Sequence, residues 1–389
     1  MGTGMKDQLI TEDYNELSEQ RWTQTQGTAW LALKRCRLMS LIPGLVAIII
    51  IGIIVFLTKK IKEDFIRDAF KSVPTDTHEL RLLLDEANRE NSRRISTVEE
   101  TCKHYHLGRY QDRKINTFYK HPPAPQYTVF YIDKVHNLSY CPVYKAGSTT
   151  WFYNLCLLNG IPEESLSNSN GQISKIARSV LPEMELPETV EALEKSTKLL
   201  VVRHPFERLL SAYRDKLENS VAGREHGTLH FYRKYGSKIV AKFRDKNVPP
   251  PRSDQVIRPK EIPPPAGIEP TWREFVQYLI HTDLASYGDD HWMPYYLFCT
   301  PCLVRFNIIA KVETLWRDQI FAMYELGVED QLTPKWKHSN AGSSDAAKIY
   351  FTQLTSDLVM QLYEKFKLDF KLFDYSPEDY YEYATLNAS

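Results

Sequence analysis

Two segments of the chain repeat one pattern, in which an apolar run of strand length leads into a short polar turn and then directly into a helical pattern. The first segment covers residues 141–151 and the second covers residues 199–214. Such a turn directs free backbone N–H groups and the positive end of the helix at an anion. Because strands that alternate with helices form a parallel sheet flanked by helices, the pattern predicts an α/β fold with two anion sites.

The first segment offers a run of residues that suits a phosphate. They are Lys145, Ala146, Gly147, Ser148, Thr149, Thr150 and Trp151. Gly147 lets the backbone approach an anion closely, because it has no side chain in the way. A standard P-loop requires its lysine directly after the second glycine, whereas Lys145 lies two residues before Gly147. A nucleotide kinase or NTPase therefore fits less well, and no acidic motif for magnesium stands out.

The second segment offers Arg203 at the end of its predicted strand and Ser211 in the helix that opens at Pro205. A guanidinium makes forked, charge-assisted hydrogen bonds to a phosphate, and a hydroxyl adds another donor. Arg203 alone would be equally typical of a surface ion pair. The joint occurrence of both segments instead predicts two phosphate sites separated by about the length of a nucleoside.

A third stretch extends the pattern, with Asp290-His-Trp-Met-Pro294, Leu297-Phe-Cys-Thr-Pro-Cys302 and Ile309-Ala-Lys-Val-Glu-Thr-Leu315. In order and spacing, these motifs and the closing segment 367–375 resemble the Golgi carbohydrate sulfotransferases. The resemblance is closest to the chondroitin, dermatan and N-acetylgalactosamine 4-O-sulfotransferase branch, and it covers residues 95–380. It implies a P-loop-like nucleotide-binding sulfotransferase fold.

The resemblance also implies the reaction, in which a sulfuryl group passes from 3′-phosphoadenosine 5′-phosphosulfate to a carbohydrate hydroxyl. The first candidate is the 4-hydroxyl of N-acetylgalactosamine in chondroitin or dermatan. Lys145 and the backbone around Gly147 would hold the 5′ side of the donor, Arg203 and Ser211 would hold its 3′-phosphate, and no metal is expected. Two departures bear on the acceptor: His204 stands where many relatives carry an acidic residue, and a proline-rich insert covers residues 248–270.

A hydroxyl nucleophile needs a base, and His291 is the first choice because histidine titrates near neutral pH. Asp290 is expected to orient it or support its charge. A structural histidine beside Trp292 is the competing interpretation. Glu207 is the alternative base, and Lys145 is expected to neutralise charge on the leaving phosphate.

A different class of function is a membrane-anchored protein that binds glycosaminoglycan without catalysis. Residues 212–260 carry 12 Lys or Arg against 5 Asp or Glu, a net charge of +7 that would attract a polyanion. This class explains the charge but not two anion sites at helix starts. The formal net charge of the whole chain is zero, which argues against a nucleic-acid partner. The sequence predicts no oligomeric state.

Residues 38–58 are uncharged and dominated by Ile, Leu and Val, which predicts a transmembrane helix retained as a signal anchor. We expect a cytosolic tail at 1–37, a stem at 59–120 and a lumenal catalytic domain at 121–389. The positive-inside rule does not decide the orientation. The sequon at Asn137 favours a single-pass type II protein of the Golgi membrane.

Five cysteines follow the predicted span, so at least one thiol stays free or pairs outside the chain. Cys299-x-x-Cys302 could hint at zinc, but a structural disulfide or a buried thiol is the favoured interpretation. The strand-like runs are 127–132, 138–144, 198–202 and 306–311, and the predicted helices are 78–105, 151–159, 205–217 and 315–326. Thr271-x-x-Glu274 predicts a capping box that opens another helix.

Overall fold

The computed structural model describes residues 73–112, 114, 119–167, 173–221, 228–245, 265–335 and 343–385. All of them belong to one compact unit, Lys71–Ser389. The predicted cytosolic tail, the predicted transmembrane segment 38–58 and most of the insert at 248–270 lie outside the described residues. Among the described residues, no helix is both long and apolar enough to span a membrane.

One four-stranded sheet forms the centre of the fold, in the order β1 (Tyr131–Asp133), β2 (Leu138–Cys141), β3 (Thr197–Val202) and β4 (Ile308–Lys311). Strands β2, β3 and β4 are parallel, as the alternating pattern predicted. Strand β1 is antiparallel to β2, so the sheet is mixed and the prediction of a wholly parallel sheet is wrong there. Only the turn at 134–137 separates the two strands, and so short a connection permits only a hairpin.

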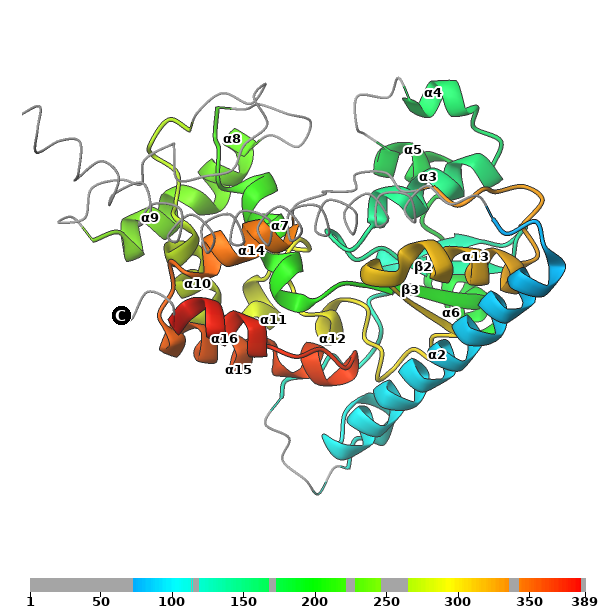
Figure 1. The fold of residues 1–389 in the computed structure, drawn as a ribbon, viewed down its shortest axis with the longest axis horizontal. Coiled ribbons are helices and arrows are strands. Elements are labelled where there is room, and N and C mark those ends of the chain that lie inside the picture. The colour runs from blue at the N-terminus through cyan, green and yellow to red at the C-terminus, as the bar shows by residue number, and fades with distance from the viewer. Residues whose placement is uncertain are drawn as a thin grey trace, which may run out of the picture. The chain divides into compact units, whose positions relative to one another are not determined.

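Helices cover both faces of the sheet because side chains along a buried strand point alternately to either face. Leu199 and Val201 of β3 pack in one apolar core with α3 (Ser148–Leu158), α5 (Ile173–Val180) and α13 (Leu315–Leu326). Leu200 and Val202 pack in a second core with α6 (Leu186–Lys195), α12 (Tyr295–Phe298) and α15 (Ser356–Leu372). The predicted α/β architecture is confirmed in this respect (Figure 1).

A separate apolar core joins helices that follow β3 to the C-terminal helices, around Trp272, Phe275 and Trp292. Besides α15, its elements are α7 (Pro205–Lys216), α8 (Thr228–Phe231), the π-helical turn η3 (Tyr232–Gly236), α9 (Ser237–Phe243), α10 (Trp272–His281), α11 (Leu284–Tyr287), α14 (Ser343–Phe351) and α16 (Glu378–Thr385). The predicted capping box is confirmed, since Thr271 and Glu274 exchange side-chain and backbone hydrogen bonds at the start of α10.

The shorter elements lie at the ends of these segments. They are the 3₁₀ turns η1 (Gly108–Tyr110), η2 (Tyr127–Val129) and η5 (Val312–Thr314), and the short helix α4 (Glu163–Ser167). Turn η2 takes up half of the strand predicted at 127–132, and residues 142–144 lie beyond the end of β2.

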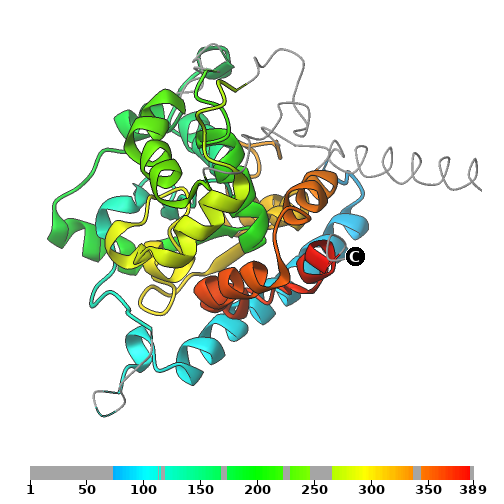
Figure 2. The same ribbon diagram turned by 90° about the vertical axis from the view of Figure 1, so that its left-hand side faces the viewer.

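A long helix, α2 (Thr77–His104), comes from the range predicted as a stem and packs along the open edge of the sheet at β4 (Figure 1). The Asn91 amide accepts a hydrogen bond from the Ile309 N–H at 2.9 Å and donates one to the Asn307 carbonyl at 2.8 Å. Buried Arg94 donates to the Ile309 carbonyl and pairs with Asp318 at 2.6 Å. These side chains satisfy backbone groups of an edge strand, which would otherwise be free to pair with another chain. Figure 2 shows α2 beside the C-terminal helices, where it contacts α15.

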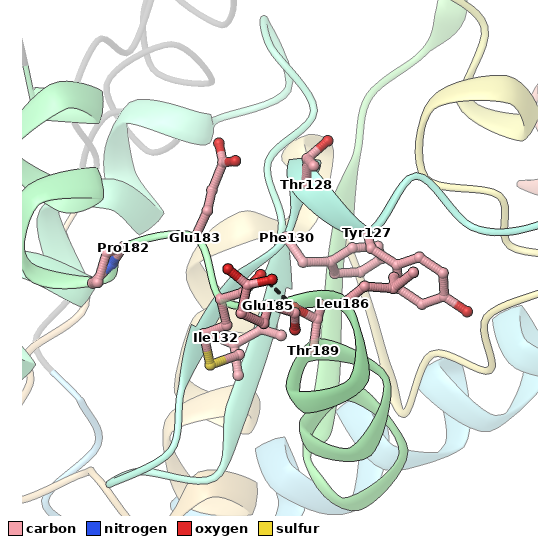
Figure 3. Close-up of a pocket in the computed structure, with 10 residues that line it drawn as sticks. Tyr127, Thr128, Phe130, Ile132, Pro182, Glu183, Glu185, Leu186 and Thr189 are labelled. Atoms are coloured by element: carbon pink, nitrogen blue, oxygen red, sulfur yellow. Dashed lines mark hydrogen bonds between the residues drawn. The ribbon is translucent and has the colours of Figure 1, made fainter.

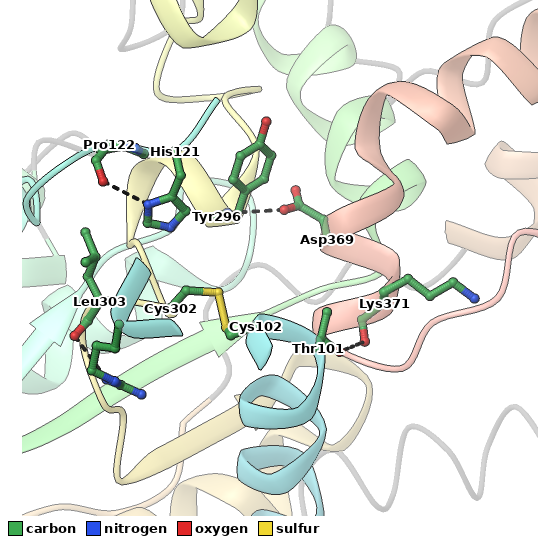
Figure 4. The surroundings of a disulfide bond; sticks show 10 residues. Thr101, Cys102, His121, Pro122, Tyr296, Cys302, Leu303, Asp369 and Lys371 are labelled. Atoms are coloured by element: carbon green, nitrogen blue, oxygen red, sulfur yellow. Dashed lines mark hydrogen bonds between the residues drawn. A yellow bond between two sulfur atoms is a disulfide. The ribbon is translucent and has the colours of Figure 1, made fainter. Parts of the chain in front are cut away.

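Two disulfides fasten loops to this framework. Cys102 at the end of α2 bonds to Cys302 (Figure 4). Cys141 at the end of β2 bonds to Cys299. The two cysteines of the C-x-x-C pair therefore have different partners, and the zinc alternative is wrong for them. Cys156 is a free, buried thiol, and burial raises its pKa to about 11. The prediction of one unpaired thiol is confirmed for these five cysteines.

Candidate active site

The first predicted anion loop lies between β2 and α3. Gly147 precedes the helix with φ of 74°, in the left-handed region that favours glycine. A Cβ at this position would also come within 3.4 Å of Leu315 Cδ2. Lys145 has a φ of 68° as well, so the turn bends sharply twice before the helix. This geometry turns the backbone toward the N-terminal end of α3, where free N–H groups gather.

The side chains of this loop differ in how accessible they are. Ala146 and Trp151 are fully buried, and Trp151 packs beside Tyr140 in the core. Ser148 and Thr150 are buried as well, whereas Lys145 and Thr149 are partly exposed. A ligand at this loop would therefore meet the ammonium group of Lys145 and backbone groups more than the side chains of Ala146 or Trp151.

Lys145 is held by a carboxylate from the end of α7. Its Nζ lies 3.1 Å from Asp215 Oδ2, and buried Lys216 contacts the same oxygen at 3.0 Å. Burial alone would raise the pKa of Asp215, but the two ammonium groups outweigh it and keep that pKa well below its usual range. Asp215 is thus a charged bridge between two lysines, and its role was not predicted from the sequence.

The second predicted anion loop directly adjoins the first. The Arg203 guanidinium lies at the end of β3 and reaches the Lys145 carbonyl at 3.5 Å and Glu207 Oε2 at 3.0 Å. The Tyr295 hydroxyl accepts from the Arg203 N–H and donates to the Arg203 carbonyl, which fixes the backbone there. Ser211 lies two turns further along α7 and is half-buried. The structure therefore brings together the two segments that the sequence singled out.

Glu207, the alternative base, already has two partners. It accepts from Arg203 and, at 3.1 Å, from the Tyr380 hydroxyl of α16. Burial raises its pKa, and the Arg203 charge works against that rise. His204 is also engaged, since its Nε2 lies 2.8 Å from the Ser376 carbonyl and its ring stacks on Tyr380. Both residues thus connect the second loop to the C-terminal segment.

His291 lies in the loop before α12 and stacks on Tyr144, the neighbour of Lys145, with ring centroids 4.8 Å apart. The carboxylate that orients its ring is Asp289 rather than Asp290, whereas Asp290 interacts with His291 only through its charge. Asp289 Oδ1 accepts from the backbone N–H of His291 at 3.2 Å and contacts its Nδ1 at 2.7 Å. The turn brings the Asp289 carboxylate to Nδ1 of the ring, whereas the Asp290 carbonyl accepts a hydrogen bond from Arg208.

The environment of His291 favours the neutral imidazole. Burial lowers its pKa most, Asp289 opposes this, and the ammonium groups of Lys216 and Lys145 lower it further. With Nδ1 facing a carboxylate, the proton belongs on Nδ1 and the lone pair on Nε2. No described group bonds to that Nε2, which leaves it able to accept a proton.

Arg208 organises these three loops although the sequence assigned it no role. It is almost fully buried and donates to the carbonyls of Tyr144 at 3.0 Å, Asp290 at 3.0 Å and Met293 at 2.7 Å. It belongs to the quoted motif Arg-x-Pro-Phe-x-Arg, so a signal was present in the sequence. One guanidinium from α7 thereby fixes the first anion loop and the histidine loop relative to each other.

A pocket elsewhere on the described surface contains none of the predicted site residues. It lies between η2, β1 and the start of α6, and Figure 3 shows Tyr127, Ile132 and Leu186 among the residues that line it. Within the described ranges, no group of three or more His, Cys, Asp or Glu side chains is placed to hold a metal ion.

The chain is similar in sequence to proteins of one known family. The model of the sulfotransferase family matches residues 128–376, which is more than half of the chain. Carbohydrate sulfotransferase 11 of Mus musculus is 31% identical over 256 residues, which cover 64% of this chain and 67% of that protein.

Two human proteins are also similar. Carbohydrate sulfotransferase 9 of Homo sapiens is 27% identical over 317 residues, covering 78% of this chain and 65% of that protein. Carbohydrate sulfotransferase 8 of Homo sapiens is 28% identical over 297 residues, covering 74% and 63%. No solved structure matches the chain significantly. The resemblance that the motifs predicted is confirmed: the chain is an enzyme and belongs to the sulfotransferase family.

Proposed function

We propose that this enzyme transfers the sulfuryl group of 3′-phosphoadenosine 5′-phosphosulfate to a hydroxyl of a carbohydrate. The sulfotransferase family implies that donor, and the names of the similar proteins support a carbohydrate acceptor. The observation that carries the proposal is the contact of Arg203 with the Lys145 carbonyl, which joins two strand–turn–helix anion loops. The 4-hydroxyl of N-acetylgalactosamine in chondroitin or dermatan is the first candidate for the acceptor position.

The donor has two separated anionic ends, and the two loops offer one cation to each. Lys145 and the N–H groups around Gly147, Ser148 and Thr149 would bind the 5′-phosphosulfate, while Ala146, Thr150 and Trp151 would shape the loop. Arg203 would bind the 3′-phosphate with its fork of donors, and Ser211 would add a hydroxyl. A second phosphate site of this kind distinguishes the donor from ATP, which has no phosphate on its ribose.

In the proposed transfer step, the proton passes from the acceptor hydroxyl to a base of the enzyme. The acceptor oxygen forms a bond to sulfur while the bond from sulfur to the bridging phosphate oxygen breaks, and adenosine 3′,5′-bisphosphate leaves with that electron pair. His291 Nε2 takes the proton of the attacking hydroxyl, with Asp289 holding Nδ1. Lys145 neutralises the charge that grows on the leaving phosphate. Glu207 is the weaker candidate for the base, because Arg203 and Tyr380 occupy its carboxylate.

The competing proposal is a binding protein that holds glycosaminoglycan without catalysis. It draws support from the exposed cations Arg233, Lys234 and Lys238 near α9. It gives no account of two adjoining strand–turn–helix loops joined by the contact of Arg203 with the Lys145 carbonyl. A nucleotide kinase explains the anion loops but not the lysine position in the first of them.

Thermal unfolding with different ligands separates the three classes. We expect adenosine 3′,5′-bisphosphate to raise the Tm without magnesium, since a ligand that binds only the folded state stabilises it. Stabilisation by ATP with magnesium alone would favour the kinase, and a response to the polysaccharide alone would favour the binding protein. Transfer of labelled sulfate to chondroitin, dermatan, heparan and N-glycan acceptors, followed by disaccharide analysis, then identifies the acceptor.

We further propose that the enzyme is a single-pass type II protein of the Golgi membrane with a lumenal catalytic domain. Exposed Asn137 in the turn between β1 and β2 supports this orientation, because its side chain is accessible to a glycan. Two disulfides in the described domain also fit an oxidising compartment.

A further inference from the structure

One carboxylate connects the candidate base to the basic stretch beyond α7. Asp289 uses its Oδ1 for the ring and backbone of His291. Its other oxygen, Oδ2, accepts from the Tyr235 hydroxyl at 2.9 Å and from Lys234 Nζ at 3.4 Å. Both donors come from the π-helical turn η3, so two consecutive residues of the basic stretch contact the carboxylate that orients the histidine.

We propose that Asp289 couples the capture of an anionic acceptor to the activation of His291. In the free enzyme Lys234 shares this carboxylate with the histidine. A sulfate or uronate group of the acceptor that binds Lys234 withdraws it from Asp289 and leaves the carboxylate to His291. The inference rests on the proposed function, and within it Asp289, Lys234 and Tyr235 are positioning residues that act through His291.

Lys234 is placed to exchange partners in this way. About half of its side chain is exposed, at 52%, whereas Asp289 is only 10% exposed. Its contact with Asp289 is the longest of the four that this carboxylate makes, and its ammonium also lies over the Tyr235 ring at 4.8 Å. A long ion pair whose cation is half exposed contributes little stability, because water screens the ammonium group. A multivalent polyanion that binds Lys234 therefore loses little free energy by breaking its ion pair with Asp289.

Tyr235 differs from Lys234 in what it can do. It is partly buried and packs against Trp292 with ring centroids 4.9 Å apart, so its hydroxyl stays on Oδ2. Asp289 consequently keeps its orientation when Lys234 leaves, and only its charge balance changes. Lys234 and Tyr235 belong to a π-helical turn, which is wider than an α-helical turn. In an α-helix consecutive side chains point about 100° apart, and π-helical turns are often found at functional sites.

The effect on His291 follows from the charges that face it. The negative charges are Asp289 and Asp290 of its own loop and Asp215 of α7. The positive charges are Lys216 of α7, Lys145 of the first anion loop and Lys234 of η3. The neutral rings of Tyr144 and Phe231 fill the remaining contacts. Removing one cation from this set leaves more negative potential at the imidazole. The pKa of His291 should then rise by about half a unit to one unit.

A higher pKa makes the histidine a stronger base while the acceptor is in place. In the free enzyme the same group stays neutral and weakly basic, because burial and the nearby lysines lower its pKa. The acceptor itself adds negative charge and acts in the same direction. Activation would thus depend on an anionic neighbour of the reacting sugar, which favours a sulfated or uronate-bearing polymer over a neutral oligosaccharide.

The test is a pH titration of His291 in the full chain in detergent. NMR of ¹³C-labelled histidine carbons monitors the titration. The His291→Gln variant identifies the signal. Lys234→Gln should raise the pKa of His291 by about half a unit to one unit, as removal of one nearby charge would. Arg233→Gln and Lys238→Gln are matched controls, because these cations belong to the same stretch but do not contact Asp289. Neither should move the signal appreciably.

In the second part of the experiment, the titration is repeated with chondroitin sulfate present. The polymer should raise the pKa of His291 in the wild type and raise it clearly less in Lys234→Gln, while desulfated chondroitin should act more weakly. The acid limb of kcat/KM for a neutral oligosaccharide acceptor should shift with the NMR value. Equal pKa values in Lys234→Gln and Arg233→Gln would overturn the coupling. Absence of sulfuryl transfer by the wild type would instead overturn the proposed function, and the titration would still decide the coupling.

Discussion

At the residue scale, each of the two main cations of the candidate site meets a carboxylate of the protein itself. Lys145 lies 3.1 Å from Asp215, and Arg203 lies 3.0 Å from Glu207. These contacts hold both side chains in position before the donor arrives, so less side-chain entropy is lost when it binds. They also compete with the donor for the same hydrogen bonds. A ligand with two separated anionic groups can displace both carboxylates, whereas a simple monophosphate meets only one cation.

Lys145→Ala and Arg203→Ala should each abolish most of the transfer while leaving the fold intact. Each substitution removes a charged donor, and the loss should be about 30- to 1,000-fold in kcat/KM, or ~2–4 kcal/mol. Labelled sulfate transfer and the Tm measure activity and folding separately. Lys195→Ala is the control, since this exposed lysine pairs with Glu191 on the surface of α6. If both site variants fold and keep normal activity, the donor assignment is wrong.

The pH dependence of the reaction should identify the base. An imidazolium cannot accept a proton, so kcat/KM should fall as the pH falls through the pKa of His291. Burial places that pKa below the usual 6.5, and the neutral base form therefore predominates at pH 7. His291→Gln should remove this acid limb and lower the rate by about 100- to 10,000-fold. An unchanged limb in His291→Gln would transfer the role to another group, of which Glu207 is the first.

At the element scale, local signals predicted more than long-range ones. Helix α13 begins and ends as predicted, because Gly327 stops it in the left-handed conformation. Helix α7 begins at Pro205 for the reason that the sequence suggested. The direction of β1 could not be read from its apolar residues, since alternation is the same in parallel and antiparallel strands. It depends on the short turn that follows.

The packing of α2 could not be predicted from the sequence, for a different reason. Its buried polar residues, Asn91 and Arg94, read as part of a solvated helix face, and their partners lie more than 200 residues away. Contacts between distant parts of the chain also determine the candidate site. Two loops were predicted from their motifs, whereas the partner of His291 depends on the exact shape of a turn. The hydrogen bonds of Arg208 go to backbone carbonyls, which carry no signature in the side chains of the sequence.

Helix α2 should stabilise the catalytic domain through Arg94. Replacing Arg94 with Ala removes the closer of the two cations that contact buried Asp318 and leaves it with Arg317. Loss of one member of a buried ion pair destabilises by about 3–5 kcal/mol, and the second cation places this variant at the lower end of that range. Arg93→Ala is the matched control on the same helix. Its pair with Asp374 is exposed and should contribute at most ~1 kcal/mol. Urea unfolding gives both values, and equal effects of the two variants would contradict the role of α2 in covering β4.

At the scale of the whole molecule, the orientation across the membrane determines what the enzyme can meet. If the chain after residue 58 is lumenal, Asn137 should carry a glycan in microsomal or cellular preparations. A mobility shift that disappears with glycosidase treatment and in Asn137→Gln measures this. Protection of the C-terminal domain from protease added outside microsomes is the companion measurement. An unmodified Asn137 in a domain that cytosolic protease can cut would rule out the type II orientation.

The acceptor is also a property of the whole surface, because a polymer contacts residues far from the reacting hydroxyl. Arg233, Lys234 and Lys238 are exposed on η3 and α9, beyond the end of α7 where Lys145 and Asp215 meet. Changing all three to Glu should raise the KM for a sulfated or uronate-bearing polymer, and added salt should have the same effect on the wild type.

Donor affinity should hardly change in this triple variant, since none of the three residues contacts Lys145 or Arg203. Binding of adenosine 3′,5′-bisphosphate measures that separately from the polymer. Lys195→Glu, on α6, controls for a general loss of positive charge. An unchanged KM for the polymer would mean that the basic stretch is an ordinary solvated face. A neutral oligosaccharide would then be the better acceptor, because three of the four cations on η3 and α9 would have no effect on the binding of a polyanion.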